Sequence, residues 1–469
     1  GDVYKRQAQN VEVNVHKTEW MALNTIAALL ILCCVAFPVI SSGLVSPYLA
    51  MVFGRVPYVI GKDAMYLMVV IVAFIAVVLL TSFRVSNKPH VNVYLSGVGT
   101  DKYRHFRGSM GHEVKAEKRN WYSEDALGEK RISPVGSVVC CSIILFALLC
   151  CAWIGPERLA MSAPSVLRGK YFEGSGVVGI FIGTVAFALI APLVGGLIDG
   201  LDRKLSARMQ GRVGPRLLQP FYDVAKLLRK APASVNTMDD TYMACALIFT
   251  VVGGGIFVSG SNTLLCAFMV TLAAIFVVLA SASTQSPFAQ VGADRELLQV
   301  MSYEPAVLLM SVGLYLATDS FDSIAVTGQS APIIVYSAPI FLALLAVLTI
   351  KLRKSPFDLS YSHHAHQEIV QGVATEMSGG TLAKMTLMHW CETVLFLMWV
   401  GMFFVWDNPV SWVVALAVMA ATYFVEVLID NTFARSTWRS CFKLGWGVAL
   451  VFGLLNLMPV SYTHLRAHE

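Results

Sequence analysis

The residues best suited to chemistry lie in one polar segment, residues 351–380, which separates two long apolar runs of the chain. The segment and the start of the next run carry these carboxylates and imidazoles: Asp358, His363, His364, His366, Glu368, Glu376 and Glu392. Titratable side chains at membrane depth are costly to keep, and by default they indicate a functional site. The alternative is an ordinary solvated loop, so the surroundings of the segment have to distinguish the two.

The three histidines of this segment allow two interpretations. His363, His364 and His366 are spaced closely enough to chelate a metal ion, but no further set of ligands accompanies them. Histidine also titrates near neutral pH, which suits a residue that takes up or hands on protons. The pattern therefore favours protonatable or hydrogen-bonding histidines, where protons enter, over a metal site.

Two further polar segments share this character. Residues 199–230 begin with a dense run of arginines, which positive-inside bias and lipid headgroups would also explain. From Pro215 on, apolar residues recur every three to four positions, which predicts a helix lying at the membrane interface.

In residues 284–309, Glu304 stands directly before Pro305. A proline in the first turn and a carboxylate at the positive end of the helix dipole predict the start of a span there.

Composition indicates an integral membrane protein. Of the 469 residues, 56% are hydrophobic and only 14% are charged, whereas soluble domains carry about 25% charged residues. The ten cysteines form no C-x-x-C pair and no cluster with zinc or iron–sulfur spacing. If the chain serves a redox enzyme, we expect the electrons to stop at a partner.

The elements that position these segments are expected to be membrane helices, about eleven in all. The first three are expected near residues 21–40, 64–83 and 136–154. A second set of eight is expected near residues 175–197, 241–259, 264–280, 305–317, 331–352, 386–405, 411–429 and 441–457. The expected fold is an all-α polytopic bundle of three plus eight transmembrane helices.

Positive charge falls on alternate connections of the second set. Residues 200–240, 281–302, 351–385 and 431–440 hold most of its Lys and Arg, whereas 260–263, 318–330 and 406–409 hold none. By the positive-inside rule, the basic connections are cytoplasmic. All three polar segments are therefore expected on the cytoplasmic side.

The chain divides into two main parts. Residues 1–7 and 461–469 resemble translated sequencing-adapter read-through and are set aside. Residues 8–155 form an N-terminal piece, 156–173 a linker and 174–460 the eight-helix part. A natural fusion and an assembly join both remain open as the origin of this arrangement.

A set of short motifs runs through the eight-helix part in order. They are Asp202–Arg203–Lys204, Ala207–Arg208–Met209–Gln210, Arg212–Val213–Gly214–Pro215, Gln219–Pro220, Asp223–Val224–Ala225–Lys226–Leu227, Ser302–Tyr303–Glu304, Pro356–Phe357–Asp358, Glu368, Glu376–Met377–Ser378–Gly379 and Glu392. With these motifs, residues 173–457 resemble the eight-helix membrane subunit that complex I shares with membrane-bound NiFe hydrogenases.

One stretch separates the branches of that family. After Pro356–Phe357–Asp358, complex I typically has a proline and a tight run of carboxylates. Here the residues are Ser360–Tyr361–Ser362–His363–His364–Ala365–His366–Gln367–Glu368. This resembles the eight-helix membrane subunit of the energy-converting, Ech-type hydrogenases and departs from the quinone-side pattern.

The N-terminal piece resembles a different subunit of the same hydrogenases. Asn92–Val93–Tyr94–Leu95–Ser96–Gly97 and Arg119–Asn120–Trp121–Tyr122, followed by a last span, are similar to the C-terminal end of their antiporter-like membrane subunit. The front half of that subunit would hold its ion channel, so no ion-path residues are assigned here.

The resemblance implies a non-catalytic membrane subunit of an oxidoreductase complex. A proton or coupling path would use Glu304, Asp358, His363, His364, His366, Glu368, Glu376 and Glu392. A docking surface would use Asp202, Arg203, Arg208, Gln210, Arg212, Arg216, Asp223 and Lys226. The chain would link ferredoxin-dependent H₂ evolution to H⁺ or Na⁺ translocation, and neither the ion nor the physiological direction follows from the residues.

The implied surroundings are a prokaryotic cytoplasmic membrane and a set of partner subunits. The partners would be the large and small hydrogenase subunits, a ferredoxin-like iron–sulfur subunit and a full antiporter-like subunit, with no nucleic acid. The chain itself would hold no cofactor or metal, and the NiFe centre and iron–sulfur clusters would lie in the partners. One alternative is a quinone-site subunit of a complex I-like dehydrogenase, and another is a stand-alone cation/proton antiporter or passive anchor.

Overall fold

The computed structural model describes residues 177–230, 238–284, 286–318, 320–357, 359–361 and 370–466, four positions between 21 and 29, and two short strands. The strands, β1 (His105–Arg107) and β2 (Glu113–Lys115), pair antiparallel with Phe106 opposite Val114, and the sequence did not predict them. Apart from this pair the described elements are helical, which confirms the all-α fold.

The described part of the second set has eight long helices. They are α8 (Val177–Met209), α10 (Met238–Val258), α11 (Thr263–Ser283), α12 (Pro287–Thr318), α14 (Ile334–Lys351), α15 (Gly379–Met402), α16 (Val410–Thr432) and α17 (Trp438–Arg466). The shorter elements are α9 (Gln219–Arg229), α13 (Ser323–Thr327) and a 3₁₀ turn at Gly372–Ala374. All but α17 of the long helices are long and apolar enough to cross a membrane. The protein is therefore a multi-pass membrane protein.

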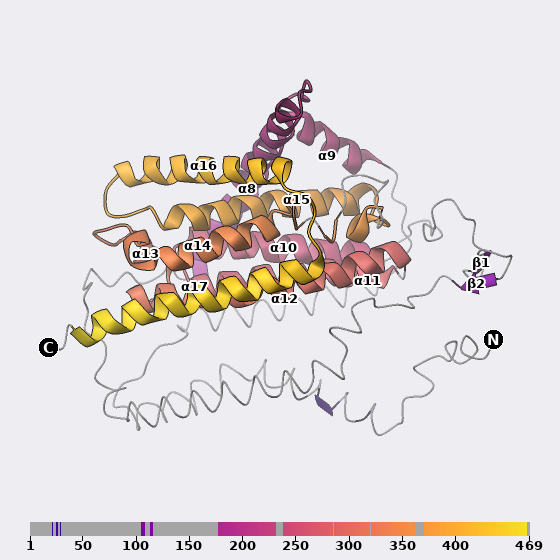
Figure 1. The fold of residues 1–469 in the computed structure, drawn as a ribbon. Helices are drawn as coiled ribbons and strands as arrows, with labels where there is room; N and C mark the ends of the chain where they lie inside the picture. The colour runs from indigo at the N-terminus through magenta and orange to yellow at the C-terminus, as the bar shows by residue number, and fades with distance from the viewer. Residues whose placement is uncertain are drawn as a thin grey trace. The chain divides into compact units, whose positions relative to one another are not determined.

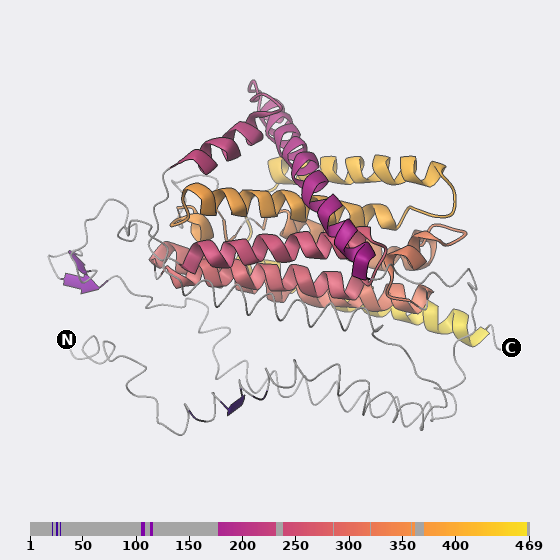
Figure 2. The same ribbon diagram turned by 180° about the vertical axis from the view of Figure 1, so that it is seen from behind.

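Helix α15 lies at the centre of this bundle. It packs against α8, α9, α10, α14 and α16, and it is the most buried of the seven candidate spans. Most of the long helices run side by side, whereas α8 crosses them obliquely (Figures 1 and 2). Polar side chains on α15 are therefore held inside protein rather than against lipid.

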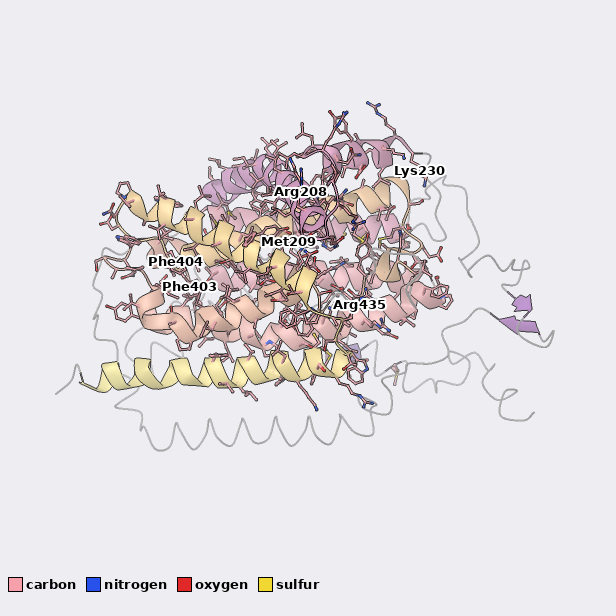
Figure 3. All side chains as sticks on the ribbon, turned by 45° about the horizontal axis from the view of Figure 1, so that its top comes forward. Arg208, Met209, Lys230, Phe403, Phe404 and Arg435 are labelled. Atoms are coloured by element: carbon pink, nitrogen blue, oxygen red, sulfur yellow. The ribbon has the colours of Figure 1, made fainter. Side chains whose placement is uncertain are left out.

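The connections of the bundle separate into two ends, as the charge pattern predicts. At one end the connections without Lys or Arg are joined by backbone hydrogen bonds, from Ser323 N to Ser261 O (3.0 Å) and from Asp407 N to Gln329 O (2.9 Å). Phe403 and Phe404 lie at this end, and Lys230 and Arg435 lie at the other (Figure 3). The described parts of the three polar segments therefore belong to the basic end, which the charge pattern predicts to be cytoplasmic.

Close helix packing depends on glycine at two crossings. A Cβ atom on Gly195 of α8 would lie 2.6 Å from the Trp390 carbonyl oxygen of α15, and one on Gly445 of α17 would lie 2.2 Å from the Ser302 carbonyl oxygen of α12. Both distances are shorter than any real contact, so only glycine lets these backbones approach. Small residues at helix contacts are the usual way in which membrane helices pack.

A span is present near residues 305–317 as predicted, but its predicted start is wrong, because α12 begins at Pro287 and runs through Pro305. Proline has no N–H, so the Met301 carbonyl loses its helical partner. The Trp446 indole of α17 donates to that carbonyl at 3.1 Å. A neighbouring helix thus supplies the missing bond, which is how membrane helices tolerate an internal proline.

Two other boundaries differ from the prediction. Helix α8 extends beyond the expected 197 to Met209 and stops just before Gly211, which adopts a positive φ of 72°. The helix predicted after Pro215 is confirmed as α9, with Pro220 and Val224 buried; its place at the membrane interface stays a prediction. Helix α17 extends past the expected 457 to Arg466.

Candidate functional site

The end of α14 and the residues after it bring three cations into the interior. Lys351, Arg353 and Lys354 lie within four positions, and their side chains are only 5%, 11% and 9% exposed. A buried charge is tolerated when it is paired and hydrogen-bonded. Each of the three is paired with carboxylates from other helices, and together we term them the cationic hub.

Lys351 is paired with α15. Its Nζ lies 2.6 Å from Glu392 Oε1, and both side chains are buried. The ammonium also lies 4.4 Å from the ring centroid of Tyr303, a geometry that favours a cation–π interaction. His389, one turn before Glu392 on α15, places Nδ1 3.5 Å from Glu392 Oε2. The site thus joins a carboxylate, an ammonium and an imidazole within reach of proton exchange.

Arg353 is paired with α12. Its Nη2 lies 3.0 Å from Oε1 of Glu296, a carboxylate that is 6% exposed. The Ser360 hydroxyl donates to the other oxygen of Glu296, and the Gln299 amide donates to the Phe357 carbonyl. Arg295 donates to the Leu359 carbonyl at 3.2 Å. Polar side chains in the first half of α12 therefore hold residues 353–360, the start of the segment after α14, in place.

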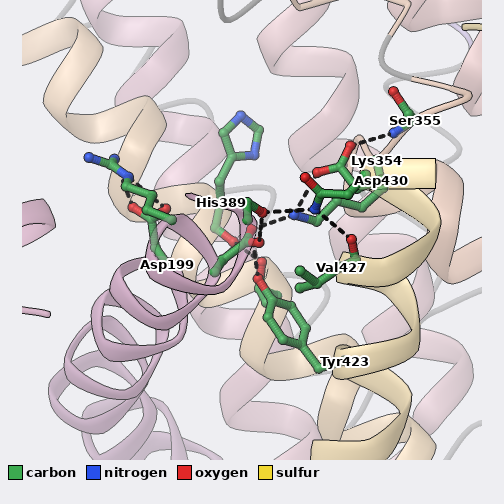
Figure 4. A network of polar contacts seen from close by, with 12 residues as sticks. Asp199, Lys354, Ser355, His389, Tyr423, Val427 and Asp430 are labelled. Atoms are coloured by element: carbon green, nitrogen blue, oxygen red, sulfur yellow. Dashed lines mark hydrogen bonds and ion pairs between the residues drawn. The ribbon is translucent and has the colours of Figure 1, made fainter. Parts of the chain in front are cut away.

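Lys354 is paired with α8 and α16. It forms ion pairs with Asp202 of α8 and with Asp430 of α16, the latter at 3.3 Å. Asp202 also accepts from the Tyr423 hydroxyl at 3.2 Å, and Asp430 accepts from the Ser355 backbone N–H at 2.9 Å. Figure 4 shows these side chains converging between the two helices. Lys354 therefore links the outer helices to the centre of the site.

The pKa values of two groups in this region, Lys354 and Tyr361, are both raised, for different reasons. Burial lowers the pKa of Lys354, but the carboxylates of Asp202 and Asp430 outweigh it, so the net pKa is raised. Burial raises the pKa of the Tyr361 hydroxyl against the opposing effect of nearby arginines. Both groups keep their protons at neutral pH, and Lys354 is a fixed positive charge.

A more exposed group of charges lies on the outer side of α8. Arg203 pairs with Asp199 at 3.0 Å and with Asp223 of α9 at 2.7 Å. The Trp390 indole of α15 donates to Asp199 at 3.2 Å. These contacts clamp α9 onto α8 and α15, so the Arg-rich region has a defined shape.

Comparison with known proteins identifies the family. Residues 182–461 match the sequence pattern of the family described as NADH dehydrogenase. The chain belongs to this family. Its cationic hub and the helices that carry it lie within the matched region.

Relatives of this NADH dehydrogenase family member fall into two kinds. The chain is 28% identical to hydrogenase-4 component C of Escherichia coli, covering 59% of this chain and 97% of that protein. It is 27% identical to formate hydrogenlyase subunit 4 of the same organism, covering 58% and 96%. It is also 27% identical to the H subunit of the NADH-quinone oxidoreductase of Dehalococcoides mccartyi, covering 57% and 82%.

A solved structure supports the fold. The chain matches one chain of the membrane-bound sulfane sulfur reductase, an archaeal respiratory membrane complex, with a TM-score of 0.54 and 20% identity. The match covers 60% of this chain and 99% of that one.

The structure describes three of the eight residues expected on the coupling path. Glu392 lies at its centre, and Glu304 follows the hub contact Tyr303 on α12, in the middle of a helix rather than at the start of one. Glu376 lies in the turn before α15. The remaining path residues lie outside the described residues: Asp358, His363, His364, His366 and Glu368.

The expected docking surface divides into two groups. Asp202 pairs with Lys354 and its side chain is 16% exposed, so it is less accessible to a partner than the expectation implies. Arg203 and Asp223 hold α9 in place, and Gln210 donates to Asn431 at 3.0 Å and accepts from Arg212. The exposed cations of the set are Arg208, Arg212, Arg216 and Lys226. They are the side chains available to a partner.

Sequence reasoning missed most of the buried partners. Lys351, Arg353 and Lys354 looked like the basic start of a loop, and Glu296 was placed in a loop between spans. Glu426 was not considered at all. Its signal was a carboxylate inside the apolar run 411–429, which is by itself a reason to look for function.

Proposed function

We propose that this chain is the membrane coupling subunit of an energy-converting NiFe hydrogenase. In this role it docks hydrogenase and ferredoxin-side subunits at its basic end and links ferredoxin-dependent H₂ evolution to movement of H⁺ or Na⁺. The relatives support a membrane subunit of a multi-subunit complex, since their names describe components of hydrogenases and of quinone oxidoreductases. The chain would anchor and couple rather than catalyse.

The observation that carries this proposal is the cationic hub. Three buried cations within four consecutive positions of one segment form four ion pairs, to α15, to α12, to α8 and to α16. Charges in a low-dielectric interior act on one another strongly. Charge placed beside one pair at the basic end therefore changes the energy of the others, and through them the protonation of Glu392 and His389.

The hydrogenase branch is favoured over the quinone branch by one stretch of sequence. Identity does not separate them, because hydrogenase and quinone relatives lie at 27–28%. Residues 360–368 carry three histidines where the quinone-side pattern has a run of carboxylates. This supports the Ech-type assignment, with a quinone-site subunit as the second candidate.

The location and partners follow from the same proposal. A prokaryotic cytoplasmic membrane would place the basic end in the cytoplasm. There the exposed cations Arg208, Arg212, Arg216 and Lys226 would receive the hydrogenase subunits. The NiFe centre and iron–sulfur clusters would be held by those partners, and a full antiporter-like subunit would complete the ion path.

The test uses inverted membrane vesicles that contain this chain with its neighbouring subunits. Reduced ferredoxin is supplied while H₂ and the fluorescence of an internal pH dye are followed. H₂ release with acidification, abolished by a protonophore, supports the proposal with H⁺ as the ion. H₂ release with sodium uptake supports it with Na⁺. Electron flow to an added quinone without H₂ would move the assignment to the quinone branch, and ion exchange without any peripheral subunit would indicate an antiporter.

A further inference from the structure

A second buried carboxylate lies beside the Lys354 cluster and is not used by the hub. Glu426 is on α16, one helical turn before Asp430, and only 3% of its surface is exposed. The opposite face of α16 carries exposed apolar side chains such as Phe424 and Leu428, as expected of a face in lipid. Glu426 therefore points to the protein side of a peripheral helix.

The two oxygens of this carboxylate have different environments. Oε1 accepts a hydrogen bond from the Thr349 hydroxyl of α14 at 3.1 Å. Oε2 is buried and has no hydrogen-bond partner among the residues that the structure describes. An ionised carboxylate needs partners on both oxygens when it is buried. A carboxylic acid whose C=O accepts from Thr349 satisfies the same geometry at much lower cost.

The charges around Glu426 also oppose its ionisation. Among the described residues of this cluster Lys354 is the one cation, and it is already shared by Asp202 and Asp430. The hydrophobic cluster of this region is apolar or phenolic and includes Leu397 of α15 with Tyr423 and Val427 of α16. With Glu426 neutral the cluster carries one net negative charge, and with Glu426 ionised it carries two.

We propose that Glu426 holds a proton at neutral pH and is a second protonatable site of the coupling path, separate from the Lys351–Glu392 pair. Its role in coupling rests on the proposed function, whereas its protonation does not. When the proton leaves, the new negative charge lies next to the pairs of Lys354 with α8 and α16. Loss or gain of this proton therefore changes the strength of the ion pairs that join Lys354 to α8 and α16.

The experiment is infrared spectroscopy of the complete complex in membranes, read at the C=O stretch of protonated carboxylic acids. At neutral pH the band is expected in the wild type, absent in Glu426→Gln and unchanged in Asp407→Asn, which alters an exposed carboxylate. Titration to alkaline pH should remove the band from the wild type. A neutral-pH spectrum that Glu426→Gln leaves unchanged would overturn the proposal.

A second variant keeps the test decisive if Glu426→Gln fails to assemble. Thr349→Val removes the hydrogen bond to the C=O and should move the band to higher frequency. The matched control is Thr250→Val, because Thr250 is also buried but donates only to its own helix, at Ala246. A band unmoved by Thr349→Val would contradict the assignment. Either result leaves the vesicle test of coupling untouched, so the two proposals fail separately.

Discussion

At the level of single residues, the Lys351–Glu392 pair shows why the site is sensitive to substitution. Taking both charges out of water is expensive, and their mutual attraction offsets this only while both are present. The pair is closed at 2.6 Å and covered by Tyr303 and Phe396. Its value to the protein is therefore in specificity and charge coupling more than in stability.

Substituting Lys351→Met should lower the free energy of unfolding by about 3–5 kcal/mol, because it leaves Glu392 buried without a counter-charge. Adding Glu392→Gln should recover most of the loss, since no unpaired charge then remains. The measurement is denaturant unfolding in detergent micelles for both single variants and the double variant. Losses that simply add would show that the two side chains do not depend on each other.

Lys354 predicts a pH dependence at the alkaline end. Its folded pKa is raised above that of an unfolded lysine, because two carboxylates outweigh the effect of burial. The stability it contributes is therefore complete below the unfolded pKa and is lost as pH rises through the folded pKa. The difference in unfolding free energy between the wild type and Lys354→Met should stay constant at neutral pH and shrink in strongly alkaline solution. If this difference in unfolding free energy already shrinks in the neutral range, about pH 6 to 8, the prediction is contradicted.

At the level of elements, the packing of α17 on α12 includes one hydrogen bond that replaces a bond missing from α12. The Trp446 indole donates to the Met301 carbonyl, which Pro305 leaves without its helical partner. Trp446→Phe should cost about 1–3 kcal/mol of unfolding free energy, because the Met301 carbonyl is left without a donor in an apolar environment. In a Pro305→Ala background the new backbone N–H reaches that carbonyl, so the same substitution should cost much less. Unfolding of the four proteins of this cycle measures the coupling, and equal costs in both backgrounds would refute it.

The helices were predictable from the sequence where apolar residues run without interruption, as in α10, α11 and α16. The start of α12 was not, because Pro305 and the charged residues before it look like a loop when their partners are unknown. Glu296 and Gln299 become helical residues only because the segment after α14 satisfies them. The extension of α8 has the same cause, since Asp202 is held by Lys354.

At the level of the whole molecule, the separation of connections with and without Lys and Arg followed from the sequence, because membrane insertion acts on local positive charge. The candidate site followed only in part. Glu392 could be found as a carboxylate in an apolar run, but its partner Lys351 comes from another helix, 41 positions away. Contacts between helices distant in sequence leave no local pattern, so Glu296 was missed, whereas Glu426 carried the same local signal as Glu392 and was overlooked.

The exposed arginines of the basic end predict a salt-sensitive docking surface. Arg208→Ala combined with Arg212→Ala should reduce co-purification of the hydrogenase subunits at low ionic strength. The difference from the wild type should shrink at high ionic strength, because salt then screens the exposed charges of the wild type as well. Lys443→Ala removes another exposed cation, on α17, and serves as the control. If the hydrogenase subunits co-purify with the double variant as fully as with the wild type at low ionic strength, these arginines do not form the docking surface.

The most direct test of the account is the number of ions moved per H₂ in inverted vesicles that contain Glu392→Gln. If the cationic hub couples the two reactions, this ratio should fall to background in the variant, while Asp407→Asn, at an exposed carboxylate of the opposite end, keeps the wild-type ratio. A wild-type ratio in Glu392→Gln would contradict the central claim, because ion movement would then proceed without the buried carboxylate at the centre of the site.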